Sequence, residues 1–447
     1  MPRRLFLVLL LAACGSDQVL EHDLEPIQLA RAPIEPGGAT TGGLLAAVSV
    51  GDSVEPLLVD SAFPLNSLAK AGCASPAASG WTYTGTMELR AGGDPAAPVR
   101  ASFRSVGLFD ICPGPSGDAA TQPAGVMGGP LLANFSVGLT LPRDAGSSAF
   151  MELWPGFPGT DDQLARDGLV VLHFEPRGGA SAGRGSGEAS LTLPNSRIVL
   201  AACAAPRAFA TTEAQELCGH GEAALTASGQ DMMLAVGTGE GPLVLSEMAW
   251  QRVAAWLGVA AEAGTAGDLY APFRATATPA RFVDVPRLAI FQGTTDNAWL
   301  GACAELARAR RIEWVLANQD SGARFQPCDL SGGRAVWTHA YLELGGSLRA
   351  AVVSNTSDII RSLNADVPPK PQVDGIIGAG TLAGTRLRLD YPAETGGRVV
   401  VRCEAGSARE LCWAAPSCPP LSAGDQTHTC FGHAAAGLAA RPATDSR

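Results

Sequence analysis

One short pattern occurs twice in this chain, and this repeat limits the possible folds more than any other feature of the sequence. Residues 124–142 (AGVMGGPLLANFSVGLTLP) align without a gap on residues 374–392 (DGIIGAGTLAGTRLRLDYP), at a constant offset of 250. Apolar pairs also recur inside the two segments, so both copies are predicted to form the same local structure. The identical positions are Gly125, Gly128, Leu132, Ala133, Leu139 and Pro142, which recur as Gly375, Gly378, Leu382, Ala383, Leu389 and Pro392.

A second match precedes each copy of the first. Residues 57–68 (LLVDSAFPLNSL) correspond to residues 234–246 (LAVGTGEGPLVLS). Two motifs that occur in the same order in both halves indicate an internal duplication. The facing residues are Asp60 and Gly237, Ser61 and Thr238, and Ala62 and Gly239.

Short apolar segments bounded by Gly, Asp and Pro predict a mostly β protein. The chain of 447 residues has 53 Gly and 32 Pro, which favours many turns and short strands. Helical periodicity is limited to residues 246–257 (SEMAWQRVAAWL) and residues 302–312. Few short helices are therefore expected.

The paired motifs resemble those of the aspartic peptidases. In that family each half of the molecule has an apolar strand ending in Asp-Thr/Ser-Gly, followed later by two apolar residues and a Gly, as in residues 125–128 (GVMG) and 375–378 (GIIG). The resemblance implies a bilobal, pepsin-like architecture, with related β lobes at residues 43–160 and 161–412 and a cleft between them. Residues 81–86 (WTYTGT) faintly resemble the flap of the family, although a plain β-hairpin is the simpler interpretation.

The resemblance also implies a catalytic pair that this chain lacks. Two close carboxylates share a proton, so that one activates water while the other donates to the scissile carbonyl. Asp60 is kept as a lone or vestigial acid, whereas Gly237 stands where the second aspartate belongs. In the family the hydroxyl of the second motif residue bonds to the opposite loop, and both Ser61 and Thr238 have such a hydroxyl.

Two other acids are poor replacements for the missing aspartate. Asp320 begins a matching triplet with Ser321 and Gly322, but no apolar strand precedes it, which favours a polar turn. Asp231 lies at the start of the predicted strand rather than at its end. Ala62 also departs from the family glycine, which is tolerable only if the backbone φ stays negative there.

The amino terminus resembles a bacterial lipoprotein signal. Arg3 and Arg4 precede an apolar run that ends in LAAC at residues 11–14, and this run is too short to span a bilayer. The resemblance implies a signal peptide at residues 1–13, acylation of Cys14 and anchoring to the outer membrane, facing the periplasm or cell surface. Residues 14–42 are interpreted as a tether, and residues 413–447 as a tail.

The other ten cysteines form an even set, which agrees with export to an oxidising compartment. Sequential pairing is the simplest hypothesis, although several connectivities remain open. It would join Cys73 to Cys112, Cys203 to Cys218, Cys303 to Cys328, Cys403 to Cys412, and Cys418 to Cys430.

Composition limits the partners. The net charge of −11 and the absence of a basic run argue against nucleic-acid binding. No cofactor or metal is expected, because the cysteine in the histidine-bearing segment 428–433 is better explained by a disulfide.

We therefore expect a lipid-anchored, aspartic-peptidase-like protein that is catalytically inactive and binds extended polypeptide in the interlobe cleft. One alternative is an active aspartic endopeptidase with an unorthodox second acid. Another is a structural or interaction lipoprotein whose cleft is closed.

Overall fold

The protein is described here from a computed structural model. The structure describes residues 18–20, 26–31, 43–50, 53–63, 65–69, 81–83, 86–90, 98–104, 107–111, 123–143, 147–154, 156, 159–174, 177, 181–182, 191–192, 196–205, 229–269, 278–293, 301–306, 340–364, 372–391, 397–405, 407–408 and 411–415. Cys14, the expected signal peptide and most of the expected carboxy-terminal tail lie outside these residues. Within them, no helix is both long enough and apolar enough to cross a membrane.

Strands dominate the described residues, which confirms the predicted mostly β class with few short helices. The helices are α1 (Gly129–Leu132), α2 (Asp161–Arg166), α4 (Glu247–Leu257) and α6 (Asp358–Asn364), and residues 302–306, in the segment predicted to be helical, are also helical. The strands are β1 (Gln18–Leu20), β2 (Ile27–Arg31), β3 (Leu44–Val50), β4 (Ser53–Asp60), β5 (Ser67–Ala69), β6 (Trp81–Tyr83), β7 (Thr86–Arg90), β8 (Val99–Arg104), β9 (Gly107–Ile111), β10 (Gly125–Gly128), β11 (Ser136–Leu141), β12 (Ala149–Trp154), β13 (Val170–Phe174), β14 (Ser181–Ala182), β15 (Leu191–Thr192), β16 (Val199–Ala205), β17 (Gln230–Gly237), β18 (Leu243–Ser246), β19 (Thr265–Leu269), β20 (Thr278–Phe291), β21 (Tyr341–Val353), β22 (Gly375–Gly378), β23 (Thr385–Asp390), β24 (Gly397–Cys403) and β25 (Cys412–Ala415).

The two halves of the chain repeat one strand arrangement. The neighbours β3-β4-β10-β5-β9 in the first half correspond to β16-β17-β22-β18-β21 in the second. In both series the successive pairs are antiparallel, parallel, antiparallel and parallel. The register also repeats, because β4 pairs Asp60 with Gly128 and β17 pairs Gly237 with Gly378. The internal duplication inferred from sequence is therefore present in the topology.

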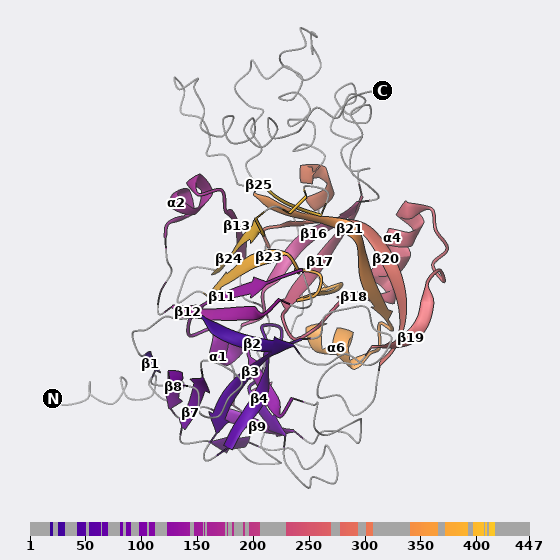
Figure 1. Cartoon of the computed structure of the whole chain (residues 1–447). Coiled ribbons are helices and arrows are strands. Elements are labelled where there is room, and N and C mark those ends of the chain that lie inside the picture. The colour runs from indigo at the N-terminus through magenta and orange to yellow at the C-terminus, as the bar shows by residue number, and fades with distance from the viewer. Residues whose placement is uncertain are drawn as a thin grey trace, which may run out of the picture.

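The halves meet through their repeated segments, at the pair β11 and β23. Ser136 pairs with Asp390 and Thr140 with Arg386, so the register is unchanged when each residue is exchanged for its counterpart at the offset of 250. The exchange maps the central pair, Gly138 and Arg388, onto itself. In Figure 1 this pair of strands lies between the amino-terminal strands and the sheet formed by β16 to β22.

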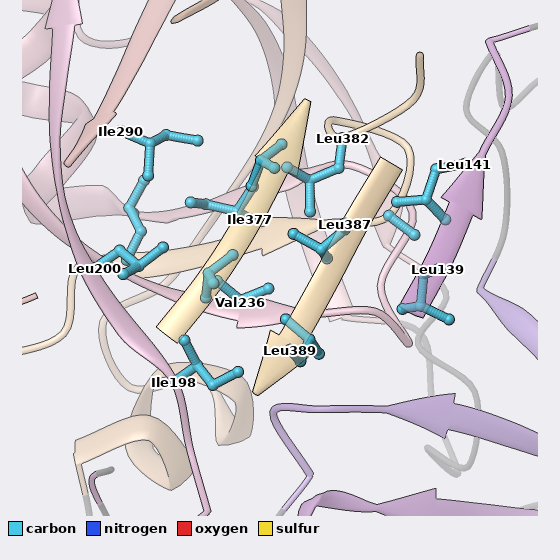
Figure 2. Packing of buried hydrophobic residues seen from close by; sticks show 14 of the residues in the cluster. Leu139, Leu141, Ile198, Leu200, Val236, Ile290, Ile377, Leu382, Leu387 and Leu389 are labelled. Atoms are coloured by element: carbon cyan, nitrogen blue, oxygen red, sulfur yellow. The ribbon is translucent and has the colours of Figure 1, made fainter. Parts of the chain in front are cut away.

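The core lies where these sheets pack. Strands β20, β16, β17, β22, β18 and β21 close into a ring, because β20 pairs with both β16 and β21. Figure 2 shows Leu387 and Leu389 of β23 between Leu139 and Leu141 of β11 on one side and Val236 and Ile377 on the other. All belong to one buried apolar cluster, so the repeats share a single core.

Three segments can be compared with the sequence expectations. The predicted helix at 246–257 is confirmed as α4, which begins where the Ser246 Oγ accepts the Ala249 N–H at 3.1 Å and ends at Gly258, with φ at 69°. Part of the segment interpreted as a tether, Ile27–Arg31, is instead strand β2, because its alternate residues Ile27 and Leu29 are buried in the core. In the part of the segment that the structure describes, β6 pairs with β9, whereas β7 pairs with β3 and β8, so these two strands do not form the hairpin predicted at 81–86.

One predicted disulfide is confirmed and two are wrong. Cys403 is bonded to Cys412, as sequential pairing requires. Cys203 is bonded to Cys303 rather than to Cys218, and this bond also excludes the pair of Cys303 with Cys328. Sequential pairing was wrong here because strand β16, which carries Cys203, packs beside the helical residues 302–306, which carry Cys303. The fold thus brings together two cysteines 100 residues apart. Cys73, Cys112, Cys218, Cys328, Cys418 and Cys430 lie outside the described residues.

Candidate functional site

Two loops that follow equivalent strands meet in the interior. The Asp60 loop (residues 60–63) follows β4, and the Gly237 loop (residues 237–241) follows β17. The glycines that end β10 and β22 let these loops pass closely. A Cβ on Gly128 would lie 2.8 Å from the Phe63 carbonyl oxygen, and one on Gly378 would lie 2.7 Å from that of Glu240. This contact explains why the repeated apolar motif ends in Gly in both copies.

The hydroxyls of Ser61 and Thr238 join the two loops. The Ser61 Oγ donates to the Val236 carbonyl at 2.7 Å, and the Thr238 Oγ1 donates to the Val59 carbonyl at 2.7 Å. Thr238 Oγ1 also accepts the Ser61 N–H at 3.2 Å. Both side chains are buried, so these bonds are shielded from water. Each hydroxyl bonds to the strand residue directly before the opposite loop.

Asp60 lies at the centre of this arrangement, with only 7% of its surface exposed. Its Oδ1 accepts the Ala62 N–H at 2.9 Å, and the backbone N–H of Gly239 also bonds to its carboxyl. The Phe63 N–H donates to the Asp60 main-chain carbonyl at 3.3 Å, and it too acts on the carboxyl. Burial raises the pKa of Asp60, while these N–H groups and the charge of Arg197 oppose the rise. Asp60 is thus a single buried carboxyl held by amides from both loops.

The residues facing Asp60 show why the two loops differ. A Cβ on Gly239 would lie 2.6 Å from the Asp60 Cγ and 2.7 Å from its Oδ2, so only glycine fits beside this carboxyl. A Cβ on Gly237 would lie 3.6 Å from the Asp60 Oδ1, which places position 237 directly opposite the acid. Gly237 brings no carboxyl and no side-chain donor to that place.

Sequence reasoning missed three buried polar residues near the loops. Arg197, whose charge acts on Asp60, donates to the Leu363 and Ser362 carbonyls at the end of α6. Burial raises the pKa of Tyr391, and the charge of Asp60 raises it further. The Tyr391 hydroxyl has no hydrogen-bond partner among the described residues. Glu240 is buried in the Gly237 loop itself. Only Glu240, an acid three residues after Gly237, could have been noticed in the motif.

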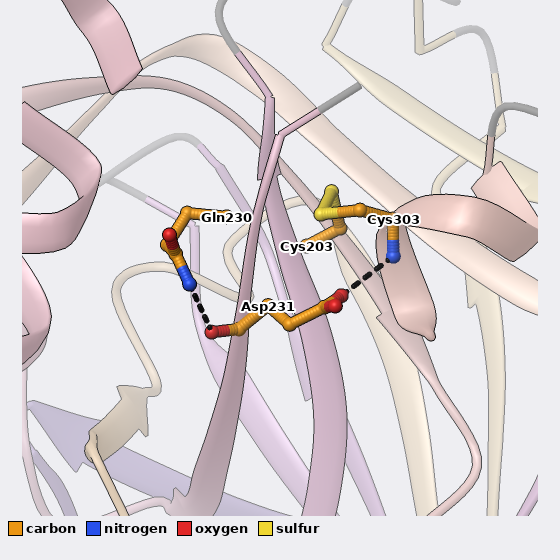
Figure 3. The surroundings of a disulfide bond; sticks show 4 residues. All are labelled: Cys203, Gln230, Asp231 and Cys303. Carbon is orange, nitrogen blue, oxygen red and sulfur yellow. Dashed lines mark hydrogen bonds between the residues drawn. A yellow bond between two sulfur atoms is a disulfide. The ribbon is translucent and has the colours of Figure 1, made fainter. Parts of the chain in front are cut away.

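Of the two acids considered as replacements, the structure describes only Asp231, which lies beside a disulfide. Asp231 accepts the Cys303 N–H at 2.7 Å, beside the Cys203–Cys303 disulfide, as Figure 3 shows. Burial raises its pKa, opposed by this bond. Asp320 lies outside the described residues, as do the histidines of segment 428–433. In the part of the chain that the structure describes, no group of three or more His, Cys, Asp or Glu could hold a metal ion.

Comparison with known proteins adds no family to this geometry. No protein-family model matches the chain, and a search of curated proteins finds no match.

Proposed function

We propose that this protein is a non-catalytic relative of the aspartic peptidases that binds extended polypeptide. The observation that carries the proposal is the pair formed by Asp60 and Gly237, which face each other across two hydroxyl-linked loops. Peptide hydrolysis by this route needs an ionised base and a protonated acid at once. A lone carboxyl cannot supply both, so the loops keep the arrangement of the peptidase and lack its chemistry.

The proposed architecture is bilobal and pepsin-like. It is supported by the repeated strand order and by the symmetric register between β11 and β23. In such an architecture a polypeptide would lie between the halves and pair with strand edges, with main-chain hydrogen bonds supplying much of the affinity. The apolar start followed by Cys14 supports a lipid anchor on the outer membrane, which would expose the protein to periplasmic or surface polypeptides.

The proposal is tested by measuring binding and cleavage on the same samples. The purified full chain is mixed with a reduced, alkylated and therefore unfolded test polypeptide between about pH 3 and pH 7, a range that spans carboxyl titration. Binding is followed by fluorescence anisotropy and cleavage by mass spectrometry, with Asp60→Asn as the matched variant. We expect saturable binding, with no cleavage beyond that of the variant. Cleavage lost in the variant would show an enzyme, and absent binding would leave a structural role.

A second candidate function, an active aspartic endopeptidase, is favoured by one observation. Glu240 is a buried acid in the same loop as Gly237, next to the glycine that touches Asp60. If cleavage dependent on Asp60 is found, Glu240→Gln should abolish it, whereas Asp231→Asn should not.

A further inference from the structure

We propose that Ala62 and Ile376 are positioning residues that close the place of a second carboxyl and hold Asp60 as a lone acid. This inference deepens the proposed function and rests on it. It assigns roles to two residues outside the expected catalytic pair, and it explains why Ala62 replaces the glycine expected at its position.

The argument begins with the crowding around Gly237. A Cβ at this position would lie 2.6 Å from the Ile376 Cγ2 and 3.1 Å from the Ala62 Cβ. The first distance is shorter than carbon atoms tolerate, and the second requires the neighbour to move. The Ile376 methyl is attached to a stiff β-branched carbon in buried strand β22, so it cannot easily rotate away. The backbone itself does not require glycine, because Gly237 lacks a positive φ.

The two loops therefore form reciprocal pairs. In the first pair, the Asp60 side chain faces Gly239 of the opposite loop, which has no side chain. In the second pair, the Ala62 methyl faces Gly237 of the opposite loop, which has no side chain. In both pairs the third residue of one loop limits what the first residue of the other can carry. Loss of the second acid and gain of the Ala62 methyl are thus one coupled change. Ala62 is 8% exposed and has no positive φ, so its methyl adds no backbone strain.

This closure also explains the bonding of Asp60. With no carboxyl at position 237, the Gly239 N–H donates to Asp60, which already accepts the Ala62 N–H of its own loop. Each loop gives an amide to the same acid. Asp60 consequently has a fixed orientation without a partner acid, and Gly237→Asp alone would meet the Ile376 methyl before it could form a pair.

The test uses the sign of a substitution that adds only a Cβ. Gly237→Ala is made in the natural chain and in an opened background, Ala62→Gly/Ile376→Ala, and the urea midpoint of unfolding is measured. In the natural chain we expect Gly237→Ala to lower the midpoint by overpacking. In the opened background it should raise the midpoint, because Gly→Ala otherwise restricts the unfolded chain. The matched control background is Ile377→Ala, at the neighbouring buried residue. In this background Gly237→Ala should lower the urea midpoint as much as it does in the natural chain.

A mirror experiment covers the possibility that the opened background does not fold. Gly239→Ala should lower the midpoint sharply, and Asp60→Gly in the same chain should restore most of that loss. The proposal is overturned if Gly237→Ala does not lower the midpoint of the natural chain. It is also overturned if Ala62→Gly/Ile376→Ala leaves the effect of Gly237→Ala unchanged and Asp60→Gly leaves the effect of Gly239→Ala unchanged. These measurements involve neither polypeptide binding nor cleavage, so they can fail independently of the proposed function.

A titration extends the test to chemistry. In Ala62→Gly/Ile376→Ala/Gly237→Asp, two carboxyls facing each other should titrate as a coupled pair, with one pKa above and one below the usual value. Gly237→Asp without the opening substitutions should show no such pair by carbon NMR of the carboxyls. A coupled pair in the single variant would contradict the closure by Ala62 and Ile376.

Discussion

Thr238 is expected to stabilise the two loops about twice as much as Ser61 does, and conservative substitutions can measure the difference. Thr238→Val keeps the size and branching of the side chain while removing its hydroxyl. This removes two contacts, the bond to the Val59 carbonyl at 2.7 Å and the bond from the Ser61 N–H at 3.2 Å. Ser61→Ala removes one contact, the bond to the Val236 carbonyl at 2.7 Å.

The magnitude follows from burial. Thr238 is 0% exposed and Ser61 is 1% exposed, so water cannot replace the lost partners without local opening. A buried polar group left without its partner costs about 1–3 kcal/mol. We therefore expect Thr238→Val to lower the free energy of unfolding by about 2–5 kcal/mol, against about 1–3 kcal/mol for Ser61→Ala.

The assay is urea unfolding followed by tryptophan fluorescence, with Thr238→Ser as the control that keeps the hydroxyl. Because both hydroxyls join the same loops, the double variant should lose less than the sum of the single losses. The reasoning is refuted if Thr238→Val costs no more than Ser61→Ala, or if Thr238→Ser costs as much as Thr238→Val. Either result would mean that packing, rather than the hydroxyl bonds, joins the loops.

The remaining predictions concern charge, cross-links and buried polar atoms. The pKa of Asp60 is raised in the folded protein, so its contribution to stability is greatest when it is protonated and falls as pH rises above the usual value of 3.8. Asp60→Asn should reduce this fall in the unfolding free energy between acid and neutral pH, and an unchanged pH profile would contradict it. Replacing Cys203 and Cys303 by Ala should lower the free energy of unfolding by about 4–5 kcal/mol, against about 2–3 kcal/mol for the Cys403–Cys412 pair, because the first bond closes a far longer loop. Equal losses in urea unfolding would show that loop length does not decide the difference. Tyr391→Phe removes a buried hydroxyl that has no partner among the described residues, so the melting temperature should stay the same or rise; a clear fall would indicate a bond to this hydroxyl.

Local patterns predicted much of this fold because they act over a few residues. Turn residues bounded the predicted strands, and helical periodicity over residues 246–257 predicted α4. The same order of two motifs in both halves also predicted that residues 57–60 and 234–237 would occupy equivalent strands, which their register with β10 and β22 bears out. The same reasoning misread residues 27–31, because a short strand in a polar segment gains its stability from distant partners, β3 and β12.

The sequence by itself determined that the chain is duplicated, that it is mostly β, and that one of the two equivalent loops has Asp60 where the other has Gly237. Only the tertiary structure decided how the loops compensate. The bond between Ser61 and Thr238 joins residues 177 positions apart, and the Cys203–Cys303 disulfide joins residues 100 apart. Such contacts depend on which strands become neighbours in the folded core, and no spacing along the chain records that. For the same reason Ala62 looked like an isolated departure from a motif, whereas its methyl lies against the place that Gly237 leaves without a side chain.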